Sequence, residues 1–259
     1  MKKILCLLLA LGASPMALAN DDAPDNRNPV QVSLYLWGSG LEGRVSPFRQ
    51  APEIGTEKTF SDIMDDLEFG GFVNLWLRRD RLVLSADVAY VSVGSAHAFG
   101  PLPPLPGPVP PGTVIEGSLD TRQFTASLLV GYRMIEGPDF SFDVLGGMRT
   151  WRVSNDVTVS ASGLSAGHGE RFDWVDPLLG VRASKRLSAN WTLQGQFDVG
   201  GAGVGADSTW SALGTVNWLA SDHLSASVGY KVLDVDYRDG GHVFDVRMQG
   251  PVFAVTYRF

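Results

Sequence analysis

The sequence predicts an all-β fold, a transmembrane antiparallel up-and-down β-barrel of ten strands, with eight strands as the alternative. Three observations support this prediction. Ten segments carry apolar residues at every second position, short and long connections alternate between them, and the chain ends in an alternating aromatic run. Hydrocarbon offers the backbone no hydrogen-bond partners, so strands can cross a membrane only when their sheet closes on itself.

Residues 1–19 are predicted to be a cleaved signal peptide. Lys2 and Lys3 give this segment a positive start, an apolar run follows, and residues 17–19 (Ala-Leu-Ala) form a small-x-small cleavage site. Cys6, the single cysteine of the sequence, lies within the same segment. We therefore expect no disulfide, thiol catalysis or thiolate metal site in the mature chain.

Residues 20–29 are expected to form a short periplasmic N-terminal segment, and residues 30–259 a single transmembrane β-barrel. The whole sequence carries 21 Lys and Arg residues against 28 Asp and Glu residues, a net charge of −7 at pH 7. This acidic balance argues against nucleic acid as a partner.

The ten predicted strands follow one another along the chain with a period of two. In the fourth strand, for example, Phe124, Ala126 and Leu128 alternate with Thr125 and Ser127. The predicted ranges are 30–45, 67–78, 82–93, 118–135, 140–160, 170–187, 191–204, 208–220, 224–237 and 243–259.

The connections predict which rim of the barrel faces which compartment. Bacterial outer-membrane barrels have an even number of strands, short periplasmic turns and longer outer loops. Both chain ends then fall on the periplasmic side. Short turns are expected at residues 79–80, 136–139, 188–190 and 221–223, and mostly longer loops at 46–60, 94–117, 161–169, 200–207 and 238–242.

Aromatic residues near the strand ends favour a membrane barrel over a soluble β-sandwich, whose strands also alternate. A membrane barrel carries girdles of aromatic residues where its apolar band meets water. The residues at such positions are Tyr90, Tyr132, Phe140, Trp191, Tyr230 and Tyr257.

The last strand carries a predicted assembly signal, because Phe253, Val255, Tyr257 and Phe259 stand at every second position. This ending resembles the C-terminal signature that the outer-membrane barrel assembly machinery recognises. The expected partners are this machinery and the lipid and lipopolysaccharide of the outer membrane. The expected location is the cell outer membrane, reached through the periplasm.

Further segments form a familiar set, including residues 33–37 (Ser-Leu-Tyr-Leu-Trp), 60–63, 174–177, 198–201 and 250–251. Together they resemble a widespread group of proteobacterial outer-membrane β-barrel proteins of a small, porin-like type. The resemblance covers most of the mature chain except its proline-rich segment. It implies the fold and the location, and it names no substrate.

The inward positions of the predicted strands carry charges of both signs. An isolated charge is costly in a narrow interior, so we expect these side chains to pair with one another. Ten strands enclose little more space than eight, whose interior is filled by side chains. The pairs either plug the lumen, the slightly favoured interpretation, or line a selective polar pore. The lumen-lining candidates are Glu68, Arg78, Asp87, Arg133, Asp143, Arg149, Asp176, Arg182, Arg186, Asp198, Lys231 and Arg258.

One segment before the second strand breaks the period of two. Phe60, Ile63, Met64 and Leu67 stand at i, i+3, i+4 and i+7, which predicts a short helix with one apolar face. Our hypothesis is that this helix lies over or in the outer mouth and constricts it. Its acidic residues match no cation-loop spacing, so a solvated polar face is expected there rather than a metal site.

Residues 100–112 contain seven prolines, which predict an extended, backbone-solvated segment at the surface. A variable surface loop is the preferred interpretation, and adhesion or partner docking is the alternative.

The leading functional hypothesis is a narrow porin-like channel for passive passage of small solutes. One alternative is a closed structural or adhesive barrel that presents surface loops, and another is an outer-membrane hydrolase. The acidic and histidine residues expected near the outer rim lack a recognisable catalytic spacing. We therefore expect no enzymatic activity, no cofactor and no bound metal. The rim residues in question are Asp65, Asp66, Asp234, Asp236 and His242.

Overall fold

The computed structural model describes residues 30–49, 52–99, 115–161 and 164–259. The predicted signal peptide, the segment 20–29 and the proline-rich segment 100–112 lie outside these ranges. No helix within them is long and apolar enough to span a membrane.

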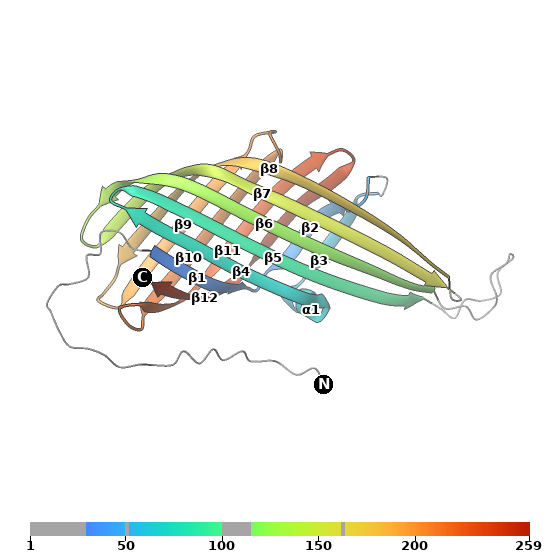
Figure 1. Ribbon diagram of the computed structural model, residues 1–259, viewed down its shortest axis with the longest axis horizontal. Coiled ribbons are helices and arrows are strands. Elements are labelled where there is room, and N and C mark those ends of the chain that lie inside the picture. The colour runs from blue at the N-terminus through green and yellow to red at the C-terminus, as the bar shows by residue number, and fades with distance from the viewer. Residues whose placement is uncertain (1–29, 50–51, 100–114, 162–163) are drawn as a thin grey trace.

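The described residues form twelve strands and one short helix (Figure 1). They are β1 (Val30–Trp37), β2 (Gly40–Ser46), β3 (Ile54–Lys58), α1 (Phe60–Asp66), β4 (Leu67–Arg79), β5 (Leu82–Phe99), β6 (Ile115–Glu136), β7 (Phe140–Ala161), β8 (Leu164–Arg186), β9 (Trp191–Gly201), β10 (Ser208–Leu219), β11 (Leu224–Asp239) and β12 (His242–Arg258).

The strands close into one antiparallel ring. From β4 to β12 each strand pairs with the next, β1 pairs with β4 on one side, and β1 also pairs with β12 on the other. β1 and β2 are two parts of one wall strand, interrupted at Gly38 and Ser39, because both pair with β12. β3 adds a hairpin to the edge of β2. The predicted ten-stranded barrel is therefore confirmed, and the eight-stranded alternative is not needed.

The two rims differ in the way that the sequence predicts. Short turns join β4 to β5, β6 to β7, β8 to β9 and β10 to β11, and the C-terminus lies at the same rim (Figure 1). We call this end the inner rim and the opposite end the outer rim. At the inner rim the ring is tied together by a hydrogen bond from the Phe259 N–H to the Val30 carbonyl oxygen, 3.0 Å long.

Several strands extend further toward the outer rim than the sequence predicts. β6, β7 and β8 contain 22, 22 and 23 residues, whereas crossing a membrane takes only about 9–11 residues in a tilted strand. Figure 1 shows these strands, together with β5, extending past β9 to β12 at the outer rim. The long loops predicted at 94–117 and 161–169 are therefore partly wrong. Beyond the membrane a strand has no need of an apolar face, so its Ser, Gly and Ala residues carried no alternating signal.

The predicted loop at residues 238–242 is also wrong in length. β11 and β12 pair up to Asp239 and His242, which leaves a turn of two residues. Gly240 and Gly241 have φ values of 57° and 86°, and two successive positive φ values are what the tightest hairpin turns require. The adjacent glycines make this turn possible.

Apolar side chains cover the outside of the ring. Leu34, Leu128, Val130 and Phe253 are between 48% and 64% exposed, while the residues between them face inward and are mostly buried or half-buried. This alternation is the arrangement expected of a barrel wall in contact with lipid.

Two neighbouring glycines of β7 give a test of the wall packing. A Cβ atom on Gly147 would lie 2.0 Å from the carbonyl oxygen of Leu128, whereas one on Gly146 would lie 3.6 Å from the nearest atom, Cδ2 of Leu179. We expect Gly147→Ala to lower the free energy of unfolding by about 1–3 kcal/mol, because the strands must shift to admit the methyl group. Gly146→Ala should have little effect. Urea unfolding of the refolded barrel in lipid vesicles, followed by tryptophan fluorescence, measures both. Equal stabilities would contradict the prediction.

Candidate functional site

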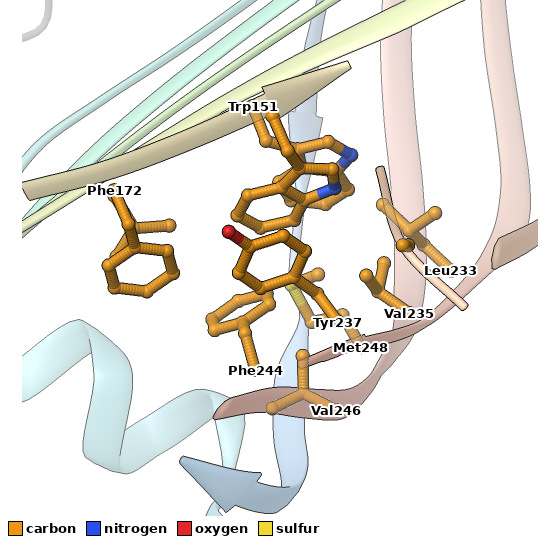
Figure 2. Packing of buried hydrophobic residues seen from close by; sticks show 11 residues of the cluster. Trp151, Phe172, Leu233, Val235, Tyr237, Phe244, Val246 and Met248 are labelled. Atoms are coloured by element: carbon orange, nitrogen blue, oxygen red, sulfur yellow. The ribbon is translucent and has the colours of Figure 1, made fainter. Parts of the chain in front are cut away.

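The interior of the barrel holds the candidate site, and its outer half is partly filled by stacked aromatic rings (Figure 2). The ring centroids of Trp151 and Trp174 lie 5.3 Å apart, and those of Trp174 and Tyr237 lie 4.1 Å apart. Phe172 stacks on His242 at 4.5 Å. These side chains come from β7, β8, β11 and β12, so they fill one side of the interior and leave the side of β4, β5 and β6 free of this cluster.

A buried ion pair lies next to the aromatic cluster, on the side of the inner rim. Arg149 Nη2 donates to Asp198 Oδ1 at 2.7 Å, and both side chains are less than a tenth exposed. The same guanidinium donates to the Ser127 and Thr209 hydroxyl oxygens at 3.1 and 3.4 Å. The group thus connects β6, β7, β9 and β10 across the interior. A charge this deeply buried is tolerated because its hydrogen bonds are satisfied.

A second buried pair lies nearer the inner rim. Arg133 donates through Nε and Nη2 to both carboxylate oxygens of Asp143, at 2.7 and 3.1 Å. Trp76 lies beside this pair, with its ring 5.7 Å from the Arg133 guanidinium carbon and 4.8 Å from that of Arg182. Arg182 also donates to Gln194 Oε1 at 2.8 Å. The inner half is therefore built from arginine, carboxylate and indole groups.

Two cavities occupy the space that these groups leave. The outer cavity, of about 650 Å³, is mainly apolar, and its lining includes Trp37, Leu41, Ile63, Met64, Phe72 and Met248. The inner cavity, of about 770 Å³, is mainly polar, and its lining includes Gln31, Ser33, Asn74, Gln194, Gln196 and Arg258.

A polar layer at mid-height separates the two cavities, and Asp87 and Lys231 line both of them. The Tyr35 hydroxyl donates to the two oxygens of Asp87 at 2.9 and 3.1 Å, and Asn74 Nδ2 donates to the same carboxylate at 3.2 Å. Lys231 Nζ lies 3.9 Å from Asp87 Oδ1 and 4.8 Å from the centre of the Trp37 ring. We call Tyr35, Asn74, Asp87 and Lys231 the mid-barrel layer.

Most of the lumen-lining candidates face the interior. Arg149 lines the outer cavity, Asp87 and Lys231 line both cavities, and Asp198 is buried in its pair with Arg149. Those on the inner cavity are Arg78, Arg133, Asp143, Arg182, Arg186 and Arg258.

Asp176 has a structural role that the sequence did not reveal. Its carboxylate accepts hydrogen bonds from the Ala206 backbone N–H at 2.7 Å and from Trp174 Nε1 at 3.0 Å. Both Asp176 and Ala206 are fully buried. The carboxylate therefore fastens the loop between β9 and β10 to the wall.

Glu68 departs from its expected position. Val91 and Val93 line the outer cavity, so Ser92 between them faces outward, and Ser92 donates to Glu68 Oε2 at 2.8 Å. Glu68 therefore lies on the outer surface instead of lining the lumen. The pairing of β4 with β5 shifts register between Leu67 and Phe69, and such a bulge reverses the face on which the next side chain lies.

The predicted short helix is present as α1. Thr59 caps its first turn: its hydroxyl accepts from the Asp62 N–H, and the Asp62 carboxylate accepts from the Thr59 N–H. This reciprocal capping box stabilises a helix too short to persist alone. The residues of its apolar face, Phe60, Ile63, Met64 and Leu67, all line the outer cavity.

Charged residues at the outer rim are held in ion pairs. Asp234 accepts from Arg247 at 2.8 Å and Asp236 from Arg238 at 3.1 Å. His242 is almost fully buried, with Nε2 at 3.5 Å from Glu170 Oε2. The N–H of Arg49 and the ring of His168 hydrogen-bond to Glu170 and lower its pKa, because both favour the ionised form. The described residues hold no group of three or more His, Cys, Asp or Glu suited to a metal ion.

Comparisons with known proteins agree with this architecture. The chain is similar to the outer membrane protease OmpT from Escherichia coli, with a TM-score of 0.55 and 10% sequence identity over 93% of this chain and 99% of that one. It also matches the translocator domain of the autotransporter NalP from Neisseria meningitidis, with a TM-score of 0.42 and 12% identity over 91% and 90% of the two chains. No protein-family model and no curated protein sequence matches. At such low identity the similarity to OmpT shows the fold alone, and that fold is an outer-membrane β-barrel.

The buried pair gives a test of how the lumen is stabilised. Asp198→Ala leaves the Arg149 charge buried without its partner, so we expect the free energy of unfolding to fall by about 3–5 kcal/mol. The matched control is Asp156→Ala, which breaks an ion pair with Arg122 whose side chains are 48% and 50% exposed. That change should cost no more than about 1 kcal/mol. Urea unfolding in lipid vesicles distinguishes the two, and equal losses would contradict the expectation that the buried Arg149 charge is costly to leave unpaired.

Proposed function

We propose that the protein is a narrow, porin-like barrel of the outer membrane that passively admits small solutes. The observation that carries this proposal is the pair of cavities inside the ring, of about 650 and 770 Å³, which share Asp87 and Lys231 as lining residues. A solute that crosses the mid-barrel layer passes directly from one cavity to the other.

The chemistry of the cavities suggests which solutes are favoured. The outer cavity is apolar and the inner one polar, so a molecule with an apolar body and a polar group finds a partner for each part in turn. The polar layer between them contains one negative and one positive side chain, so the layer carries no net charge of either sign. We therefore propose selection by size and polarity rather than by the sign of a charge.

We further propose a route to the outer membrane and the absence of catalytic activity. The route includes a cleaved signal peptide at residues 1–19, recognition of Phe253, Val255, Tyr257 and Phe259 by the assembly machinery, and contact with outer-membrane lipid and lipopolysaccharide. The proposed role is passive and non-enzymatic. In support, the rim acids Asp234 and Asp236 are bound to arginines, and the ring of His242 is stacked and buried.

Planar-bilayer recording tests the passage of solutes. Purified protein should give small conductance steps, and Lys231→Ala should enlarge them severalfold because the side chain that narrows the mid-barrel layer is shortened. Lys231→Met is the matched control, since it keeps the length of the side chain and removes its charge. Its steps should stay close to those of the wild type.

A complete lack of conductance in the wild type and in Lys231→Ala would overturn the channel and favour a closed structural barrel. The aromatic cluster and the buried ion pairs, which fill much of the interior, are the observations that make this second function worth testing.

A further inference from the structure

The wall of the barrel is not evenly paired. β1 pairs with β4 only from Val30 opposite Leu77 to Leu34 opposite Val73. Above this point the wall strand continues through Trp37 into β2, but β2 pairs with β3 instead of β4. In the described part of the chain, the outer end of β4 therefore pairs with β5 alone. We call this break the β1–β4 seam.

The helix α1 lies at the outer end of β4 (Figure 1), where it contacts β2 and β3 on one side and β5 on the other. Its first residue contacts the interrupted wall strand: a Cβ atom on Gly38 would lie 3.5 Å from the Phe60 ring, and one on Gly40 would lie 3.7 Å from the Phe60 nitrogen. Lys58 Nζ and Asp66 Oδ2, 2.8 Å apart, tie the end of the helix to β3. A short helix of seven residues, rather than a continuous ladder of backbone hydrogen bonds, thus fills the break.

The outer cavity reaches this part of the wall. Its lining includes inward side chains such as Trp37 and Phe72, and it also includes Leu36 and Phe253. Leu36 and Phe253 face outward and are 66% and 55% exposed. The lining of the cavity therefore includes outward-facing residues beside the seam as well as inward-facing ones.

A comparison with the other break in the wall shows what is unusual about the seam. The outer part of β8 also lacks a neighbour on the β9 side, where pairing starts at Leu178. There the loop between β9 and β10 is fastened to the wall by hydrogen bonds to the buried carboxylate of Asp176. The helix α1 is continuous with β4, and among the described residues no hydrogen bond to a buried side chain fastens it to β1 or β2 across the seam.

The seam opens at the depth of the lipid band. On its β4 side, the Phe69 and Tyr90 rings lie 5.9 Å apart on the outer surface, as an interfacial girdle requires. On its β1 side the exposed surface is formed by Leu34 and Leu36. The outer opening of the cavity is therefore bordered by apolar side chains at the edge of the lipid band, with the outward carboxylate of Glu68 next to Phe69.

We propose that the β1–β4 seam is a lateral portal, through which a small molecule dissolved in the outer leaflet reaches the outer cavity when α1 moves aside. The inference deepens the proposed function, because the cavity is taken to belong to the solute pathway. The occupant is a mainly apolar molecule with one polar group. The cavity volume of about 650 Å³ suits a single such ligand. The Trp37 Nε1 and Thr125 Oγ1 atoms are buried there and have no hydrogen-bond partner among the described residues.

Two leucines on one strand provide a matched pair for the test. Leu34 and Leu36 both face lipid, with exposures of 64% and 66%, but only Leu36 lies above the end of the β1–β4 pairing and lines the cavity. The probe is dodecanol brominated next to its hydroxyl group, since bromine quenches tryptophan fluorescence on contact. The readout is quenching of Trp37 in proteoliposomes after rapid mixing with the probe, with the trace of the Trp37→Phe variant subtracted.

We expect Leu36→Gln to slow Trp37 quenching about tenfold, because a polar side chain at the portal opposes passage of an apolar molecule. Leu34→Gln should leave the rate unchanged. A second variant, Gly70→Leu, places a side chain in the cavity and should reduce the extent of quenching. Gly214→Leu faces outward, where a Cβ atom would have no neighbour within 4 Å, and should leave the extent as in the wild type.

Three outcomes would overturn the portal: equal rates for the two glutamine variants, no quenching of Trp37 in the wild type, or equally fast quenching by a brominated sulfonate that does not enter bilayers. The last result would place the route at the aqueous mouth. Conductance and Trp37 quenching are separate readouts. A barrel that conducts no ions can still fill its outer cavity from the lipid, and a conducting barrel can fail this test.

Discussion

The backbone pairing that joins β1 to β12 is the constraint on which the rest of the structure depends, because an open sheet edge would face hydrocarbon without partners. Once the ring is closed, each strand has one lipid face and one interior face, and the period of two follows. Because about half of the side chains of each strand face lipid, only the other half are available to fill the interior. Among the described strands, pairing between neighbours stops above Leu34 and above Leu178, and other parts of the chain complete the wall there.

The interior combines stability with open space. Stacked rings from β7, β8 and β11 occupy one side of the outer half, and paired arginines occupy the middle and the inner half. The space that remains consists of an apolar outer cavity and a polar inner cavity. The hydrogen-bonded side chain of Asp87 lies between them. A buried charge pair costs desolvation energy, so these pairs are better understood as fixing the positions of strands than as strengthening the fold.

The sequence predicted the strand number, the short turns, the helix at residues 60–66 and the inward face of most charged residues, because all of these depend on local periodicity. It failed where periodicity carries no information. The bulge beside Glu68 reverses the alternation, and the strand extensions beyond the lipid band have no apolar face. The hydrogen bond between Asp176 and Ala206 joins residues far apart in the chain. The separation of β2 from β4 depends on which strands pair with each other, and the sequence of a single segment does not encode this.

The closure of the ring has a consequence for the order of folding. β1 is made first and β12 last, so the hydrogen bonds between Gln31–Trp37 and Val252–Arg258 span almost the entire barrel domain. Contacts at such sequence separation form late. Until the final segment arrives, β1 has only its five pairs with β4 to hold it. The ring is therefore expected to close last, when β12 pairs with β1 and both remaining sheet edges gain partners.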